Sequence, residues 1–445
     1  MNAKVIHFPT RPTRLSLRLD WFATNRSVLL GIWALYFALR AAVLLIDVVP
    51  SSDAEWYYLR AASLAAGHGY LDNAGQPTAF WPAGWPIALS LVFSRFGPSL
   101  VALGLFNLAS SMLIGLATLV LGRRLFGSEG AARAGLLLLA VYPNAIGYVP
   151  LALTEVFYTA LLMAGCWVVV TRTSRYQLVS AGMLFGLATL VKAQTLVVVP
   201  LLFAIDWLRM GDRWRRLPGL LAEGLIVVAL AALTVLPWTI RNHTQLGHWV
   251  PVSTNGGYTL LTGNHDDATG DYTPDTPVVK ELMARPGLDE VERDAEARHL
   301  GLVWITAHPD RFLELVPRKL MRLWLPDGEA EWAYQAGAPG YGRFALVYRA
   351  VRVVNQGFYV MLMLAFAAAF FVMIARRRRD GQKWMGWWLL PYGIALYPTL
   401  VCAVFSGQSR FHYPVMPWIC MTAGWLAITV LGRMSERRIP RRALH

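Results

Sequence analysis

The sequence predicts an all-α protein that crosses a membrane about ten times, and two observations support this fold class. Of the 445 residues, 56% are hydrophobic and only 15% are charged, whereas soluble globular domains carry about a quarter charged residues. Apolar runs of about 20 residues, the length that crosses a bilayer as a helix, recur along the chain. The predicted spans are 29–49, 98–122, 131–150, 155–171, 176–191, 193–208, 218–238, 346–375, 384–404 and 413–432.

The spans divide the chain into five regions and leave two long loops on one side of the membrane. The regions are a basic cytoplasmic segment, 1–28; a transmembrane module, 29–240, with a first outer loop at 50–97; a second outer loop, 241–345; the last transmembrane helices, 346–432; and a cytoplasmic tail, 433–445. No internal repeat is evident, and the outer loops are very unequal in length.

The net charge of +14 follows this topology and does not require a nucleic-acid partner. With the N-terminus in the cytoplasm, 24 of the 41 basic residues fall in cytoplasmic segments. The short outer loops hold only Arg60, Arg95, Lys192 and Arg410. Such a bias is the positive-inside pattern of membrane proteins. We therefore expect a multi-pass protein of the plasma membrane with both termini in the cytoplasm.

Each outer loop has recognisable local structure. In the first, a helix is expected over 54–66, because Gly67 and Gly69 stop it. In the second, the Gly-, Asn- and Asp-rich stretch 255–277 is expected to be loop, and 289–306 carries a helical pattern. Pro309 then begins an amphipathic helix, because proline is favoured at the first helical position. Such a helix tends to lie on the membrane surface.

Charged residues collect on the predicted outer face and indicate chemistry there. The acids are Asp53, Glu55 and Glu155, and the bases are Lys192, Arg241 and Arg410. Charge beside a membrane span is seldom placed without a use. An acid that removes a proton, facing cations that hold a phosphate, suits group transfer from a phosphate-linked donor.

Structural roles stand as alternatives for these residues. Asp53 is also suited to cap the helix that follows it, and Glu155 to complement a helix dipole. Lys192 and Arg241 are also suited to anchor span ends at the interface. Arg410 is the stronger phosphate candidate of the two arginines, because polar side chains surround it in a short loop.

No metal site is predicted, and no cofactor is required, although a divalent metal is left open. The three cysteines, Cys166, Cys402 and Cys420, lie in or beside apolar spans at no ligand spacing. His68 and His412 have no second histidine or cysteine at ligand spacing.

Taken in order, the outer-face motifs resemble a known family over nearly the whole chain. The chain looks like a bacterial GT-C glycosyltransferase of the dolichyl-phosphate-mannose–protein mannosyltransferase type, a group that also contains aminoarabinose and galacturonic acid transferases of lipopolysaccharide. The segments that carry the resemblance are Asp53-Ala54-Glu55-Trp56-Tyr57-Tyr58, Trp81-Pro82-Ala83-Gly84-Trp85-Pro86, Thr154-Glu155, Gly186 to Lys192, Pro237-Trp238-x-x-Arg241-Asn242 and Ser409-Arg410-Phe411-His412-Tyr413-Pro414.

The resemblance implies a GT-C bundle with its active site on the periplasmic side of a bacterial inner membrane. It implies that Asp53 is the catalytic base of a transferase that moves a sugar from a polyprenyl phosphate to a glycolipid, polysaccharide or protein acceptor, with inversion. Lys192, Arg241 and Arg410 are predicted to bind the donor phosphate. The residues predicted to orient the sugar or acceptor are Glu55, Glu155, Tyr57, His412 and Tyr413.

Two alternatives from other classes remain at this point. A transporter or flippase of lipid-linked sugars would share the phosphate-binding cations without needing a positioned base, but the missing internal repeat disfavours it. A structural assembly subunit would explain the topology and leave the acids and bases of the outer face without a purpose.

Overall fold

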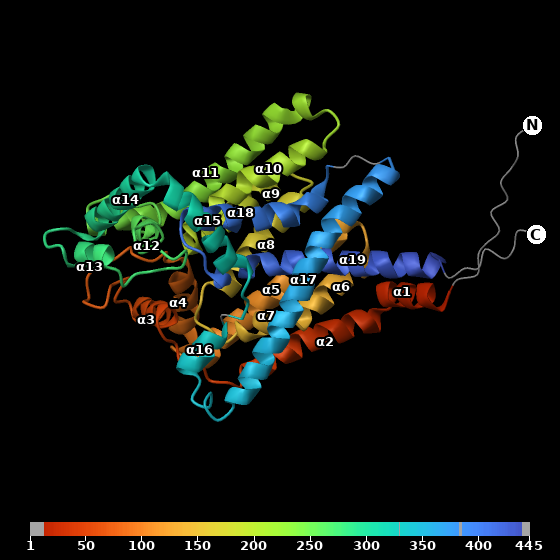
Figure 1. Ribbon diagram of the computed structural model, residues 1–445, viewed down its shortest axis with the longest axis horizontal. Coiled ribbons are helices and arrows are strands. Elements are labelled where there is room, and N and C mark those ends of the chain that lie inside the picture. The colour runs from red at the N-terminus through yellow and green to blue at the C-terminus, as the bar shows by residue number, and fades with distance from the viewer. Residues whose placement is uncertain (1–12, 329, 382–384, 438–445) are drawn as a thin grey trace, which may run out of the picture.

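The computed structural model describes residues 13–328, 330–381 and 385–437, which fold into a helical bundle capped at one end by shorter helices (Figure 1). The outermost parts of the predicted N-terminal segment and C-terminal tail, and the first residue of the predicted span 384–404, lie outside these ranges. No β-strand occurs among the described residues, so the predicted all-α class is confirmed for them.

Within residues 13–246 the structure has twelve helices, one of them a 3-10 turn. They are α1 (Arg14–Thr24), α2 (Arg26–Val43), α3 (Asp53–Ala65), α4 (Gly84–Phe96), α5 (Leu100–Phe126), α6 (Glu129–Ala140), α7 (Pro143–Gly147), α8 (Glu155–Thr171), α9 (Tyr176–Val191), the 3-10 turn η1 (Ala193–Val197), α10 (Val198–Arg209) and α11 (Arg213–Leu246).

The second half contains the helices of the long outer loop and the last helices of the bundle. They are α12 (Gly256–Thr262), α13 (Pro277–Ala284), α14 (Glu290–Ala307), α15 (Pro309–Trp324), α16 (Ala330–Gly337), α17 (Ala345–Arg379), the 3-10 turn η2 (Trp387–Leu389), α18 (Leu390–Val404), the 3-10 turn η3 (Ser409–Val415) and α19 (Met416–Arg437).

Six helical segments among the described residues are long and apolar enough to cross a membrane. They are α2, α5, α11, α17, the run Trp387–Val404 and the run Ser409–Ser435. Two further apolar helices, α8 and α9, are shorter. The remaining predicted spans fold differently: 131–150 is broken after α6 because Pro143 starts the separate helix α7, and 193–208 opens with the η1 turn. The count of ten therefore stays a prediction.

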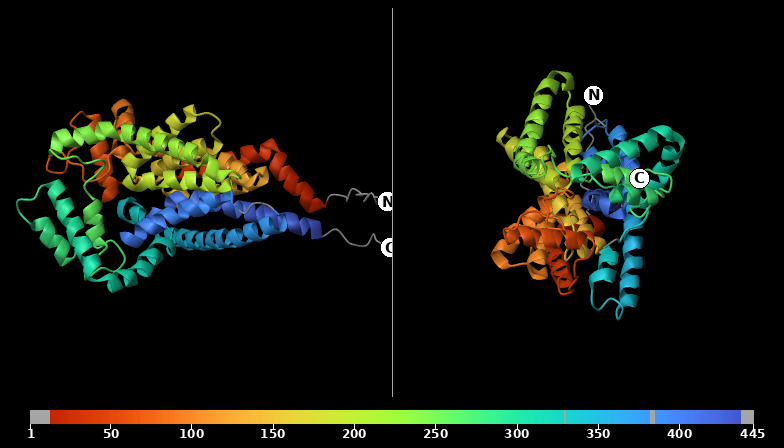
Figure 2. Two further views of the ribbon diagram at one scale, coloured as in Figure 1. Left: turned by 90° about the horizontal axis from the view of Figure 1, so that it is seen from above. Right: turned by 90° about the vertical axis from the view of Figure 1, so that its left-hand side faces the viewer.

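The helices of the two long loops gather at one end of the bundle, and the start of α1 and the end of α19 lie at the other (Figures 1 and 2). The expected helix of the first loop is α3, which ends just before Gly67. The predicted amphipathic helix is α15, with Pro309 at its first position. The stretch 255–277 was predicted to be loop, and this prediction is wrong in part because the stretch contains α12. The Asp294 carboxylate accepts hydrogen bonds from the Gly257 and Tyr258 amides and holds that helix against α14.

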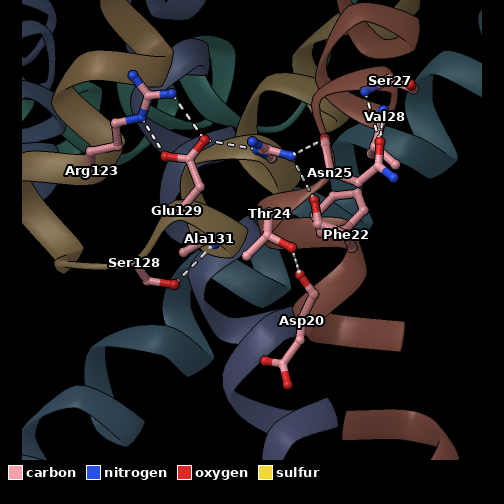
Figure 3. Close-up of polar contacts among 11 residues, drawn as sticks. Asp20, Phe22, Thr24, Asn25, Ser27, Val28, Arg123, Ser128, Glu129 and Ala131 are labelled. Atoms are coloured by element: carbon pink, nitrogen blue, oxygen red, sulfur yellow. Dashed lines mark hydrogen bonds and ion pairs between the residues drawn. The ribbon is translucent and has the colours of Figure 1, made fainter. Parts of the chain in front are cut away.

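At the end of the bundle where α1 begins, a polar cluster joins the first helices (Figure 3). Asn25 separates α1 from α2 and caps α2 by accepting from the Ser27 amide at 2.7 Å. Glu129, at the start of α6, accepts from both Arg123 of α5 and Arg133 of α6. Arg133 also donates to the Asn25 carbonyl at 2.7 Å. This cluster ties α1, α2, α5 and α6 together.

Candidate functional site

A cavity of about 350 Å³ lies where the first loop, the bundle and the long outer loop meet. Four charged residues line it: Asp53 from α3, Glu155 from α8, Lys192 from the corner after α9, and Arg410 from η3. Apolar residues such as Leu162, Ile394, Pro398, Val401 and Cys402 also line it. The cavity therefore offers charged groups and a hydrophobic surface to one ligand.

Asp53 and Arg410 form an ion pair across this cavity. Arg410 Nη1 donates to Asp53 Oδ2 at 2.7 Å, and its Nε donates to Gln408 Oε1 at 2.9 Å. Asp53 is the first residue of α3, and Ser52 occupies the cap position without a side-chain capping bond. Asp53 is therefore not the N-cap residue that the structural alternative supposed. Its carboxylate is 26% exposed, so it remains reachable for a ligand.

Glu155 and Lys192 form the second ion pair. Lys192 Nζ lies 3.2 Å from Glu155 Oε1, and the Thr154 hydroxyl donates to Glu155 Oε2 at 3.2 Å. Lys192 also lies over the Phe411 ring at 5.1 Å. The Glu155 side chain is only 2% exposed and that of Lys192 is 12% exposed. Lys192 thus points into the cavity beside Glu155 and does not reach out to an interface, as the anchoring alternative required.

Tyr57 lies one helical turn after Asp53 and also lines the cavity. Burial, together with the neighbouring Asp53 carboxylate, holds the pKa of the Tyr57 phenol well above its ordinary value, although Arg410 opposes this effect. The phenol therefore stays protonated at neutral pH and can donate a hydrogen bond to a ligand.

The structure does not bring Arg241 into the cavity with the other cations, and the prediction that all three cations share one cleft is wrong for it. Arg241 donates to the carbonyls of Tyr70 and Thr78, both at 2.7 Å, and it lies over the Trp238 ring at 4.8 Å. Because carbonyls 70 and 78 belong to the first loop, Arg241 fastens this loop to α11. Glu55 is exposed on α3 and does not line the cavity.

His412 and Tyr413 also lie outside the cavity and support it from behind. His412 Nδ1 donates to the Leu323 carbonyl at 2.6 Å, and its Nε2 lies 3.1 Å from Asp327 Oδ1. The Tyr413 ring packs on Tyr148 with centroids 4.5 Å apart. Both residues are buried, so they fix the η3 turn that carries Arg410 and do not touch a ligand in the cavity.

Two buried charges that sequence reasoning missed hold the walls of the site. Asp327 accepts from the Tyr142 hydroxyl and the Asn144 amide, both at 2.6 Å, in addition to its contact with His412. Lys319 is fully buried and donates to Asn264 Oδ1 at 2.7 Å and to the Val404 carbonyl at 3.1 Å. For Lys319 the sequence contained one signal: it is spaced four residues from Leu315 and from Leu323, on the apolar face of the amphipathic helix.

The long outer loop supplies a polar rim to the cavity. Ser253, Asn255 and Thr259 line it from the segment around α12, and Tyr272 follows them. Trp81, from the Pro/Gly/Trp-rich turn of the first loop, lies at the same rim. In the part of the chain that the structure describes, no three His, Cys, Asp or Glu side chains are grouped closely enough to hold a metal ion.

Two sequence comparisons found similarity over part of the chain. Residues 82–238 match the family model described as dolichyl-phosphate-mannose-protein mannosyltransferase. An undecaprenyl phosphate-alpha-4-amino-4-deoxy-L-arabinose arabinosyl transferase of Pseudomonas paraeruginosa (strain DSM 24068 / PA7) is 28% identical over 168 residues, which are 36% of this chain and 30% of that protein.

Solved structures of an archaeal enzyme share the fold. The oligosaccharyltransferase AglB of Archaeoglobus fulgidus, in complex with an inhibitory peptide and a dolichol-phosphate, aligns with a TM-score of 0.55 at 13% identity, over 94% of this chain and 52% of that chain. Its apo form aligns with a TM-score of 0.55 at 12% identity over the same shares. This chain thus spans about half of that structure and less than a third of the curated relative.

The predicted resemblance to the GT-C glycosyltransferases is confirmed. The family model carries it in sequence over residues 82–238, and the arabinosyl transferase carries it over 168 residues. The archaeal oligosaccharyltransferase carries it in fold over nearly all of the chain.

Proposed function

We propose that the protein transfers a sugar from a polyprenyl phosphate to an acceptor hydroxyl, with inversion at the anomeric carbon. The observation that carries this proposal is one cavity in which Asp53 and Glu155 face Lys192 and Arg410. A carboxylate can serve as general base and cations can hold a phosphate. This set therefore supplies a base for the attacking hydroxyl and positive charge for the leaving phosphate of a displacement reaction. The family match over 82–238 supports the same class of reaction.

In the proposed reaction Asp53 accepts the proton of the acceptor hydroxyl while that oxygen attacks the anomeric carbon. The bond between this carbon and the phosphate oxygen breaks, and its electron pair leaves with the polyprenyl phosphate. Lys192 and Arg410 offset the negative charge that grows on the leaving group, and preorganised charge of this kind is often the largest catalytic contribution. Attack from the side opposite the phosphate inverts the configuration.

The ion pairs suggest that phosphate binding and release of the base are linked. Asp53 is held by Arg410 at 2.7 Å. A donor phosphate competes with the Asp53 carboxylate for the same guanidinium, because arginine binds both groups through paired N–H donors. Binding of the donor therefore frees Asp53 to accept a proton from the acceptor. Glu155 keeps Lys192 directed into the cavity and, with the Tyr57 hydroxyl, orients the sugar.

The apolar residues of the cavity suit the prenyl chain of the donor. Residues Leu162, Ile394 and Val401 come from α8 and α18 and line it together with the charged residues. A polyprenyl phosphate has the matching shape, with a charged head on a long hydrocarbon chain. The polar rim at Ser253, Asn255 and Tyr272 then faces the acceptor.

The cavity is proposed to open on the periplasmic side of an inner membrane. The opposite end of the bundle carries Arg376 to Arg379 at the end of α17, and basic residues mark the cytoplasmic side. A periplasmic glycolipid, polysaccharide or protein is the proposed acceptor. The chemistry above uses only side chains of the chain and requires no cofactor.

The test is glycosidic cleavage by purified protein in liposomes that contain radiolabelled undecaprenyl-phosphate sugars, offered as a panel. We expect the wild type to release undecaprenyl phosphate and to transfer label to an added membrane-glycan extract. We expect an Arg410→Gln variant, which leaves the buried Glu155–Lys192 pair intact, to bind and cleave far less donor. If the wild type moves labelled lipid between leaflets and cleaves none of the panel, the protein is a transporter and the proposal fails.

A further inference from the structure

A second cavity lies at the end of the bundle opposite the candidate active site. Its volume is about 520 Å³, and it is enclosed by the last turns of α5, α17 and α19 and by the start of α6. Figure 1 shows the final turns of α17 and α19 far from α3 and α12, which border the first cavity. The two cavities are therefore separate.

The second cavity is strongly basic. Arg376 and Arg379 of α17 and Arg433 of α19 line it. The Asp380 carboxylate lies 3.7 Å from Arg376 Nε and 3.0 Å from Arg379 Nε. No ion pair of Arg433 is found within 13–328, 330–381 and 385–437. Three guanidinium groups facing one carboxylate leave about two positive charges in excess, so the cavity attracts an anion.

Among the side chains that the structure describes here, a second acid near this cavity is already neutralised. Glu129 follows the cavity residue Ser128 directly, but its carboxylate accepts from Arg123 and from Arg133, at 2.8 Å in the case of Arg133 (Figure 3). Two arginines against one carboxylate leave Glu129 unable to oppose an anion in the cavity. Because Arg133 is also bound to the Phe22 and Asn25 carbonyls, this arrangement is fixed.

One wall of the second cavity is apolar. Phe126, Trp425 and Ile428 line it, and the rings of Phe126 and Trp425 stack with centroids 5.9 Å apart. α17 and the run Ser409–Ser435 are both long and apolar enough to cross a membrane, so in a membrane this wall would continue into the hydrocarbon region. A ligand that fits must combine an anionic head with an apolar tail.

We propose that this cavity binds the phosphate headgroup of an anionic membrane phospholipid. Arginine pairs with phosphate through two parallel N–H donors, and basic pockets between transmembrane helices on the cytoplasmic side are suited to anionic headgroups. The lipid would clamp the end of α17 to α19 and α5, whose contacts there are otherwise apolar. This inference needs only a membrane around the bundle and does not rest on the proposed transferase activity.

Native mass spectrometry of the purified full chain, released from micelles with phosphatidylglycerol or phosphatidylcholine, tests the inference. We expect the wild type to retain phosphatidylglycerol in preference to phosphatidylcholine. An Arg376→Gln, Arg433→Gln double variant should bind phosphatidylglycerol about 30-fold more weakly, because each arginine that lines the cavity and contacts the headgroup should contribute roughly a fivefold preference. The single variant Arg433→Gln should bind phosphatidylglycerol about fivefold more weakly than the wild type.

Arg378→Gln is the matched control, because this exposed arginine lies on the same turn of α17 and does not line the cavity. It should retain the lipid like the wild type. Equal retention by the double variant and the control overturns the inference. A further arm adds inorganic phosphate: if millimolar phosphate raises the melting temperature of lipid-free wild type and displaces phosphatidylglycerol, the cavity binds free phosphate and the assignment to a lipid is wrong.

Discussion

Replacing Asp53 with asparagine should affect catalysis and donor binding in opposite directions. The substitution keeps the shape of the side chain and removes its charge, so the proposed reaction loses its general base. A general base contributes about 10²–10⁴ in rate, and we expect kcat for transfer to fall by a factor in this range. The α3 helix should stay folded, because its N-cap residue is Ser52 and not Asp53.

Binding of the lipid phosphate should instead become tighter. Asp53 competes for Arg410 at 2.7 Å, and the two side chains are 26% and 22% exposed. An ion pair in such a partly exposed setting contributes up to about 1 kcal/mol, so its removal should raise the affinity for undecaprenyl phosphate by roughly fivefold. Equilibrium binding of radiolabelled undecaprenyl phosphate to purified protein measures the affinity, and single-turnover transfer from the labelled donor measures the rate.

The matched control is Glu55→Gln, two residues along the same helix, where the side chain is exposed and does not line the cavity. It should change neither the affinity for undecaprenyl phosphate nor the rate of transfer by more than about twofold. The proposed coupling is refuted if Asp53→Asn binds undecaprenyl phosphate more weakly than the wild type. The assignment of Asp53 as base is refuted if its transfer rate matches that of Glu55→Gln.

Three further predictions concern the residues around the cavity. Lys192→Ala should destabilise the protein by about 3–5 kcal/mol, because it leaves the buried Glu155 carboxylate unpaired; adding Glu155→Ala should restore part of this loss in a denaturant titration. Burial lowers the pKa of Lys319 from 10.5 to about 8, so the unfolded chain binds more protons between these values and the stability of the wild type should rise with pH across that window. Lys319→Met should reduce this rise in thermal melts at pH 7 to 10. Gly84→Ala should lower transfer activity, because a Cβ there would lie 2.6 Å from the backbone at the end of α9, while Gly31→Ala, with nothing within 4 Å, should leave activity unchanged.

Local signals in the sequence predicted the outer-loop helices well. Gly67 lies just past the end of α3, where its φ of 80° suits glycine, and Pro309 starts α15 as expected. These features depend on neighbouring residues alone. The helix boundaries within the bundle were harder to predict, because a proline such as Pro143 is compatible both with a kink within a span and with the start of a new helix.

The members of the site could be predicted as a set, but their pairing could not. Asp53, Glu155, Lys192 and Arg410 share the predicted outer face, and all four line one cavity. Asp53 and Arg410 are 357 positions apart, so only the tertiary fold, which brings the start of α3 near η3, decides that they meet. Sequence spacing favours no particular acid for each base.

Arg241 shows why residue type alone could not distinguish residues that line the cavity from residues that stabilise the structure around it. A guanidinium beside a span end suits a phosphate and backbone carbonyls equally, and here it satisfies the Tyr70 and Thr78 carbonyls. His412 likewise binds Asp327 and a carbonyl behind η3. Loss of activity in variants of Arg241 or His412 is therefore no sign of contact with the donor. Such losses should be accompanied by a lower melting temperature, whereas the loss at Asp53 should occur with a stability change of no more than about 1 kcal/mol, the contribution of its partly exposed ion pair.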